Sequence, residues 1–291
     1  MNITLCGSDS QRSHIEWLRV FFYKLKRCGA QVTVERSFRD YLEDAGVPMG
    51  SCEPVDNLPA DCDLLLSMGG DGTFLRTAAW MRGSRVPVMG INTGHLGYLA
   101  AYSLHDMEDI MRGVRGEYEL SPRIMLELGG DDLPADFHPN ALNEIAVSKG
   151  DTTSMVRIQV YVNGHFLADY LADGLIISTP TGSTAYNLSC GGPIIEPTQA
   201  CVVLSPIAPH SLTLRPLVIS ADSVLRLEVS SRGAEECHVG VDGRTFSVDA
   251  SGSTLRIGKS RDIVNVAQPV GSFFAGVLRH KLRWGEGPLR D

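Results

Sequence analysis

The sequence predicts an α/β domain followed by an all-β domain, and three observations support this. Up to about residue 120, short apolar runs that suit buried strands alternate with segments of helical spacing. Beyond that point, apolar and polar residues alternate, as in strands with one buried face. Turn dipeptides typical of β-hairpins interrupt this second pattern. We expect domains at 1–120 and 121–271, with 272–291 packing back on the first as a helix.

The first domain is expected to be Rossmann-like, with a parallel sheet covered by helices. Apolar runs predict its strands at 3–7, 31–34, 63–68 and 86–91. Residues 13–28 carry apolar side chains at helical spacing, and Gly29 follows as the terminator. Ligands of such sheets bind at the carboxyl ends of the strands. Two glycine-rich segments, 69–73 and 92–97, fall at such ends.

The second domain is expected to be all-β, built from packed antiparallel strands. Residues 155–162 alternate, Asn163-Gly164 suits a type I′ turn, and the return strand covers 166–170. Asp242-Gly243 is a second turn of this kind. Further strands are predicted at 225–229, 239–241, 245–248 and 254–257. The segment 273–284 predicts the final helix.

Composition and charge exclude several classes of function. The chain has 291 residues, 43% of them hydrophobic, enough for a sizeable core. Its net charge is −8 and it has no long basic run, so no nucleic-acid partner is expected. No apolar stretch reaches the roughly 18 residues that span a bilayer. Within residues 1–5, no basic residue comes before the apolar ones, so a signal peptide is not expected. Seven cysteines without a C-x-x-C pair fit a reducing compartment. We expect a cytoplasmic protein without a membrane partner.

Several common catalytic motifs do not occur in the sequence. The eight histidines show no H-x-H or H-x-x-x-H spacing, so a preformed zinc site is not expected. No G-x-S-x-G elbow and no G-x-x-x-x-G-K-[ST] loop occurs. The basic cluster at 279–283 is interpreted as the solvated face of a terminal helix.

The most informative segment is 67–74, with the sequence SMGGDGTF. It places three glycines and Asp71 between an expected strand and a helical pattern at 74–81. Glycines let a ligand approach the backbone closely, and a helix start offers free N–H groups to a phosphate. The aspartate would repel that phosphate unless a metal intervenes, or unless it accepts a proton from an attacking hydroxyl. A tight turn with Asp71 as the helix N-cap is the structural alternative.

Two other segments carry polar groups suited to a nucleotide. Asn143-Glu144 precedes a strand-like run, and an amide beside a carboxylate suits a ribose diol or a base edge. The segment 173–189 is the densest run of small polar residues, with an expected helix from Thr184 and Tyr186 as a stacking surface. Its hydroxyls and helix start suit a phosphate or a purine edge. The alternatives are an ordinary loop and a Ser/Thr-rich turn.

Together with Asn92–Leu99, these segments resemble the NAD kinase family in their order and spacing, from about residue 63 to the C-terminus. The resemblance implies ATP-dependent phosphorylation of the adenosine-ribose 2′-hydroxyl of NAD, giving NADP. It implies that Asp71 is the proton acceptor. It implies that ligands are bound by Gly69, Gly70, Gly72, Arg76, Asn143, Glu144, Asp173, Thr184, Ala185, Tyr186, Asn187, Leu188, Ser189 and Arg244.

The resemblance also implies a β-sandwich-like second domain, a cofactor and an assembly. Mg²⁺ or another divalent cation would bridge the ATP phosphates, and no residue is assigned as a metal ligand of the protein. A homodimer or homotetramer is expected. Arg244 departs from the family, in which many members have glutamine after the matching Asp-Gly, so this side chain either approaches a phosphate or faces solvent. Ser154 and Leu171 are further departures, near the substrate contacts.

Two other functions stay open at this stage. Diacylglycerol and sphingosine kinases share the Gly-Gly-Asp-Gly turn, but a lipid kinase should carry a basic and apolar membrane-binding patch, which this acidic chain lacks. A non-catalytic dinucleotide-binding regulator would keep Asn143, Glu144 and the 184–189 segment. The presence of Asp71 argues against it.

Overall fold

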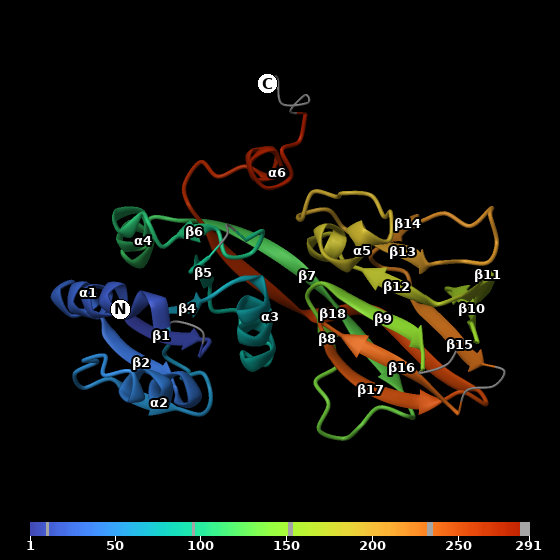
Figure 1. The fold of residues 1–291 in the computed structure, drawn as a ribbon, viewed down its shortest axis with the longest axis horizontal. Coiled ribbons are helices and arrows are strands. Elements are labelled where there is room, and N and C mark those ends of the chain that lie inside the picture. The colour runs from blue at the N-terminus through green and yellow to red at the C-terminus, as the bar shows by residue number, and fades with distance from the viewer. Residues whose placement is uncertain (10–11, 95–96, 151–153, 232–234, 286–291) are drawn as a thin grey trace. The chain divides into compact units, whose positions relative to one another are not determined.

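The computed structural model describes residues 1–9, 12–94, 97–150, 154–231 and 235–285 (Figure 1). The chain divides into two compact units. Unit 1 comprises Met1–Pro122 and Val264–Asp291, and unit 2 comprises Arg123–Ile263. An α/β unit and a β-rich unit confirm the predicted fold class. The domain limits expected from the sequence, at residues 120 and 271, stay a prediction.

Unit 1 is built on a parallel sheet in the order β5-β4-β1-β2-β3, and β6 pairs with β5. Its strands are β1 (Asn2–Gly7), β2 (Gln31–Glu35), β3 (Glu53–Val55), β4 (Leu64–Met68), β5 (Val88–Asn92) and β6 (Tyr102–Ser103). The four expected strands are confirmed. β4 and β5 are buried along their whole length, as strands covered on both faces must be.

The described part of unit 1 contains the helices α1 (Ile15–Arg27), α2 (Arg36–Asp44), α3 (Asp71–Trp80), α4 (Met107–Val114) and α6 (Phe274–Leu282). A 3₁₀ turn, Arg12–His14, leads into α1, and Gly29 follows α1 with a positive φ of 75°. Apolar side chains from α1, α2 and α4 pack on the strands in one core, which includes Leu18, Phe21, Phe38, Leu42, Ile110, Leu66 and Met89. The expected helices at 13–28 and 273–284 are confirmed within a few residues.

Unit 2 is antiparallel throughout its two main sheets, in the orders β14-β13-β12-β9-β16-β17 and β11-β10-β15-β18. The first sheet contains β9 (Glu144–Lys149), β12 (Gly174–Ser178), β13 (Cys201–Ile207), β14 (Leu217–Ser220), β16 (Glu236–Val241) and β17 (Arg244–Asp249). The second contains β10 (Val156–Val162), β11 (His165–Ala172), β15 (Leu225–Ser231) and β18 (Ser253–Gln268).

Side chains from both sheets form one core in unit 2. It includes Ile145 and Val147 of β9, Ile158 of β10 and Leu227 of β15. The packed antiparallel strands expected from the alternating pattern are thus confirmed, as is the β-sandwich-like domain that the resemblance implies. The strand β7 (Glu119–Gly130) pairs with β8 (Asn140–Ala141), and neither was expected from the sequence.

The two predicted hairpins are present. Asn163 and Gly164 have φ of 51° and 83°, and Asp242 and Gly243 have φ of 48° and 80°. Two consecutive positive φ values define the type I′ turn that joins twisted strands.

At the helix starts, the structural alternative of an Asp71 N-cap is excluded, and the helix expected from Thr184 begins at Tyr186 and is one turn long. Helix α3 begins at Asp71 and its N-cap is Gly70, so Asp71 is the first helical residue and not the cap. A 3₁₀ turn covers Thr181–Thr184, and α5 spans only Tyr186–Ser189. One turn of helix aligns too few peptide dipoles to bind a phosphate at its start. In the described ranges, no helix is both long and apolar enough to cross a membrane.

Candidate active site

The glycines between β4 and α3 differ in what the fold requires of them. Gly69 has φ of 153°, and a Cβ there would lie 2.3 Å from the Thr73 Oγ1 atom. This turn therefore needs glycine at 69 for its own geometry. A Cβ added at Gly70 or Gly72 would meet no described atom within 4 Å. The backbone at these two positions is open to a ligand.

The carboxylate of Asp71 is held by the backbone of a second loop. Its Oδ2 accepts a hydrogen bond from the N–H of Tyr98 at 2.8 Å, and its Oδ1 accepts from Leu99 at 3.0 Å and Ala100 at 3.1 Å. A Cβ at Gly97 would lie 2.0 Å from Asp71 Oδ1, so glycine is needed there for the loop to close on the carboxylate. The second glycine-rich segment of the sequence therefore orients Asp71. His95 and Leu96 of that segment lie outside the described residues.

A cation from the C-terminal helix faces this carboxylate. The Nζ of Lys281 lies 3.6 Å from Asp71 Oδ2 and 4.1 Å from the centroid of the Tyr98 ring. Its side chain is only 22% exposed, so the solvated face expected for residues 279–283 is wrong at this position. Lys281 lies three residues after Leu278, the one residue of α6 that is buried within the described chain. That spacing places the two side chains on one helix face and could have revealed Lys281.

Arg76, an expected ligand-binding residue, lies on α3 next to β1. Its Nη2 donates to the carbonyl of Gly7, the last residue of that strand. This bond ties α3 to the carboxyl end of β1.

In unit 2, Asp242 holds the Asn143-Glu144 pair. The Oδ2 of Asp242 accepts from the N–H of Leu142 at 2.6 Å, and its Oδ1 accepts from Asn143 at 2.8 Å and Glu144 at 3.1 Å. Three successive amides thus converge on one carboxylate, which fixes the backbone from which the Asn143 and Glu144 side chains project. Sequence reasoning had assigned Asp242 only to a hairpin turn.

Glu144 carries an unsatisfied buried oxygen. Its Oε2 has no hydrogen-bond partner within the described chain. Burial, with a smaller contribution from the Asp242 charge, raises the pKa of Glu144 to about 7. Buried polar atoms normally have partners, so this oxygen is suited to accept from a ligand hydroxyl.

The raised pKa gives a testable pH dependence of stability. A carboxyl group whose pKa is higher in the folded state binds more protons there, so stability falls as pH rises from the ordinary glutamate pKa to about 7. We expect the midpoint of urea unfolding to fall less between pH 5 and pH 8 in Glu144→Gln than in the wild type. Glu236→Gln, at an exposed position, is the matched control and should follow the wild type. Equal slopes in all three proteins would contradict the assignment.

The donors of Arg244 are directed at the protein. Its Nη1 donates to the carbonyl of His138 at 3.2 Å and its Nη2 to that of Asn140 at 3.0 Å. The guanidinium also lies 5.6 Å from the centroid of the Phe137 ring. Burial lowers the pKa of Arg244. The sequence left open whether Arg244 approaches a phosphate or faces solvent. The structure contradicts the second possibility, because the Arg244 side chain connects β17 to residues 138–140.

The segment 179–189 packs directly on the Asn143-Glu144 turn. The hydroxyl of Thr179 donates to the carbonyl of Leu142 at 2.5 Å. A Cβ at Gly182 would lie 2.2 Å from the carbonyl oxygen of Asn143. Among the expected wall residues, Tyr186 and Ser189 are exposed, whereas Thr184, Ala185 and Leu188 are partly exposed.

Asn187 differs from the other expected wall residues in its burial. It is fully buried; its Nδ2 donates to the carbonyls of Ser183 at 3.0 Å and Pro193 at 3.2 Å, and its Oδ1 accepts from the hydroxyl of Ser205 at 2.6 Å. Both ends of this amide are used within the protein, so Asn187 holds the wall in place.

Asp173 and Tyr186 complete the polar group around Glu144. Asp173 forms an ion pair with Lys149 at 2.8 Å, and both side chains remain about one-third exposed. The pKa of Tyr186 is raised by burial first and then by Cys190, Asp173 and Glu144. The Cys190, Asp173 and Glu144 contributions all disfavour the ionised form of the Tyr186 hydroxyl.

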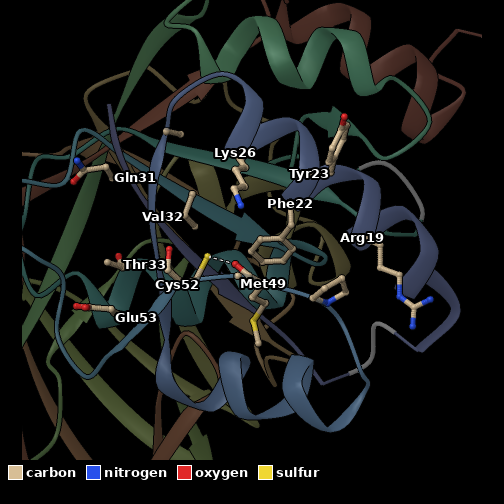
Figure 2. Close-up of a pocket in the computed structure, with 14 residues that line it drawn as sticks. Arg19, Phe22, Tyr23, Lys26, Gln31, Val32, Thr33, Met49, Cys52 and Glu53 are labelled. Carbon is tan, nitrogen blue, oxygen red and sulfur yellow. Dashed lines mark hydrogen bonds between the residues drawn. The ribbon is translucent and has the colours of Figure 1, made fainter.

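A separate cavity of about 740 Å³ lies in unit 1 beside α1, β2 and β3 (Figure 2). Arg19, Phe22, Lys26, Thr33 and Glu53 are among its lining residues. It contains none of the residues expected to bind ligand.

No cluster of three or more histidine, cysteine, aspartate or glutamate side chains with metal-binding geometry occurs in the described ranges. Asp71 is a single carboxylate, and its two oxygens already accept three backbone amides, which leaves one lone pair on Oδ2. These residues do not fit a metal site built by the protein alone. They do fit a cation that arrives with a polyphosphate, since Mg²⁺ commonly takes most of its ligands from phosphates and water.

A carboxylate held at an open glycine turn after a parallel strand, together with a nucleotide-suited polar wall on a β-sandwich, defines a two-domain nucleotide-dependent phosphotransferase. Residues 12–118 match the model of the ATP-NAD kinase N-terminal domain, and residues 142–268 match that of the ATP-NAD kinase C-terminal domain. The chain belongs to the NAD kinase family, and it is an enzyme that phosphorylates NAD with ATP.

Relatives match over nearly the whole chain. The NAD kinase of Porphyromonas gingivalis strain W83 is 39% identical over 97% of this chain and 98% of its own length. That of Christiangramia forsetii is 42% identical over 98% and 99%. Among solved structures, the NAD kinase from Archaeoglobus fulgidus in complex with ATP is 28% identical, with a TM-score of 0.72 over 96% of this chain and 99% of that one. Yeast NADH kinase complexed with NADH shares the fold, with a TM-score of 0.85, 23% identity, and coverage of 100% and 90%.

Proposed function

We propose that the chain transfers the γ-phosphoryl group of ATP to the 2′-hydroxyl of the adenosine ribose of NAD, with Asp71 as the proton acceptor. The 2′-oxygen forms a bond to the γ-phosphorus, the bond from that phosphorus to the β–γ bridging oxygen breaks, and ADP leaves. The hydroxyl proton passes to Oδ2 of Asp71. This oxygen accepts one amide hydrogen bond, whereas Oδ1 accepts two, so Oδ2 has the free lone pair.

The ordered carboxylate is the observation that carries this proposal. Three amides fix Asp71 in one orientation before a ligand arrives, and a fixed acceptor needs no reorganisation during the reaction. Phosphoryl transfer demands positioning and charge neutralisation more than covalent catalysis. The α/β domain, residues 1–120 with 272–291, would supply this acceptor and the phosphate-binding turn.

The β-rich domain, residues 121–271, would bind NAD. In our proposal Asn143 and Glu144 hold the ribose diol, because the unsatisfied Oε2 of Glu144 can accept from a hydroxyl. Asp173 contacts the dinucleotide. Tyr186 and its neighbours Thr184, Ala185, Leu188 and Ser189 form the adenine wall, which Asn187 positions from within the protein. Arg244 fixes the backbone at His138 and Asn140, a few residues before the Asn143-Glu144 pair.

Mg²⁺ or another divalent cation would bind with the triphosphate and screen its charge. Gly69, Gly70 and Gly72 would let those phosphates approach the backbone N–H groups at the start of α3. No residue is assigned as a protein ligand of the metal, and no proton transfer passes through it.

The function is tested by incubating the purified chain with ATP, Mg²⁺ and NAD and measuring NADP by chromatography. Parallel arms replace ATP by polyphosphate, NAD by NADH, and NAD by diacylglycerol or sphingosine. Formation of NADP from NAD and ATP is the expected result. NAD binding without turnover would favour the regulator, and phosphorylation of the lipid alone would favour the lipid kinase.

The open turn gives a prediction that separates ligand binding from folding. Gly72→Ala adds a methyl group where the fold has room, and alanine has the higher helix propensity by about 1 kcal/mol. We expect an unchanged or higher Tm, together with a KM for ATP raised about ten-fold or more, because the methyl group occupies space needed by phosphate. In Gly69→Ala, the strained φ and the contact with Thr73 should instead lower Tm. A Gly72→Ala enzyme with a normal KM for ATP would remove this turn from the phosphate site.

A cytoplasmic homodimer or homotetramer completes the proposal. Exposed apolar side chains on edge strands β11 and β14, among them Phe166, Leu167 and Val218, would be covered by another copy. Light scattering of the purified chain checks this, and Phe166→Ser with Leu167→Ser should shift the mass toward the monomer.

A further inference from the structure

Lys281 faces the oxygen of Asp71 that has the free lone pair. Its Nζ is nearest to Oδ2, which accepts only the Tyr98 amide. At 3.6 Å the ammonium is too far away for a good hydrogen bond. The lone pair therefore stays available to a hydroxyl, while the carboxylate charge is balanced.

The position of this ammonium is set by two contacts of different kinds. It forms the ion pair with Asp71, and it lies 4.1 Å from the centroid of the Tyr98 ring, within the range of a cation–π interaction. Tyr98 also donates the amide that Oδ2 accepts. Lysine, aromatic ring and carboxylate therefore form one cluster, drawn from α6, residues 97–100 and α3.

The cluster resolves the electrostatic conflict noted in the sequence. A carboxylate at the start of a helix repels a triphosphate that approaches the same N–H groups. With Lys281 beside it, the pair carries no net charge. Arg76, a cation on the same helix as Asp71, donates to the Gly7 carbonyl.

We propose that Lys281 is a positioning residue for phosphoryl transfer, which offsets the charge of Asp71 so that the triphosphate of ATP can approach the turn and which holds Oδ2 toward the acceptor hydroxyl. This rests on the proposed role of Asp71. The proposed role of Lys281 gives helix α6 a part in binding ATP, in addition to its part in the fold.

The test compares Lys281→Met, Lys281→Arg and Arg279→Met by calorimetric titration with Mg²⁺–ATP and by steady-state kinetics. Methionine keeps the length of the lysine stem and removes the charge. Arg279 lies on the same helix with its guanidinium 5.8 Å from the Phe273 ring centroid, and serves as the matched control. We expect Lys281→Met to weaken ATP binding about ten-fold, equivalent to about 1.4 kcal/mol, and to lower kcat, with less than about a two-fold change in the KM for NAD. Lys281→Arg should recover most of the loss, and Arg279→Met should match the wild type.

A second measurement separates charge from helix docking. In Lys281→Ala, added ethylamine should restore part of kcat, because a free ammonium can occupy the vacated place, whereas a purely structural role would give no rescue. Unchanged ATP affinity in Lys281→Met overturns the proposal, and so does a loss that neither arginine nor amine restores. ATP affinity is measured without turnover, so failure of the wild type to make NADP would reject the proposed function and leave this test intact.

Discussion

Asp71→Asn is expected to lower kcat by about 10²–10⁴-fold, the range of a general-base contribution, while NAD affinity changes little. Asparagine keeps the size of the side chain and loses the proton acceptor. Its carbonyl oxygen can still accept from the amides of Leu99 and Ala100, as Oδ1 does now. Its NH₂ group then faces the N–H of Tyr98, so one backbone donor loses its acceptor.

The lost hydrogen bond makes a stability measurement necessary beside the kinetics. Leaving one partly buried amide unsatisfied costs about 1–3 kcal/mol. Asp63→Asn is a suitable control, because the Asp63 carboxylate also accepts from a backbone amide, that of Asn2 at 2.7 Å, and is not part of the turn. We expect a smaller fall in Tm for Asp63→Asn, whose bond is exposed, than for Asp71→Asn, which also loses the charge that faces Lys281, and a large fall in kcat for Asp71→Asn only. Near-normal turnover in Asp71→Asn would exclude it as the proton acceptor.

Asp242→Asn is expected to have the largest effect on stability and to raise the KM for NAD. Oδ1 of Asp242 accepts hydrogen bonds from the amides of Asn143 and Glu144, and Oδ2 accepts from that of Leu142. The NH₂ group of an asparagine side chain cannot accept, so at least one of these backbone N–H groups loses its acceptor. The cost is about 1–3 kcal/mol for each donor left unpaired. The backbone that carries Asn143 and Glu144 would then lose its fixed geometry.

The same substitution removes a negative charge beside Glu144. The Asp242 charge contributes to the raised pKa of Glu144, so this pKa should fall in the variant. NAD titrations from pH 5.5 to 8 and urea unfolding measure the two effects. Asp249→Asn is the control, since Asp249 accepts from the Ser251 amide at 2.7 Å in the exposed turn that follows β17. If Asp242→Asn matches Asp249→Asn in both NAD affinity and urea unfolding, the three hydrogen bonds to Asp242 do not fix the geometry of the NAD site.

The fold could be predicted where apolar periodicity is strong. The strands around Leu64–Met68 and Val88–Asn92, and the hairpins at Asn163 and Asp242, follow from local sequence alone. The helices α2 and α4 were not expected. They span only nine and eight residues, and such short helices are stabilised by packing rather than by their own propensity. Phe38 and Ile110, buried in the core of unit 1, supply that packing.

The candidate site was only partly predictable for a related reason. Asp71, Asn143 and Glu144 stand in local motifs, and the residues that hold them come from distant parts of the chain. Asp242 reaches the 142–144 backbone from a hairpin about a hundred residues later. Lys281 reaches Asp71 from the final helix. The spacing of Leu278 and Lys281 indicates only that Lys281 lies on the buried face of its helix; which partners Asp242 and Lys281 meet depends on the tertiary fold.

The return of the chain to unit 1 has a consequence for protein synthesis. Val266 and Ala267, at the end of β18, pair in parallel with Val88 and Met89 of β5. On the ribosome, β5 can pair with β4 early, but its edge toward β18 must wait until the whole of unit 2 has been translated. The backbone donors and acceptors of Val88 and Met89 on that edge stay open to other chains meanwhile. A nascent chain stalled before residue 264 should thus be prone to aggregation.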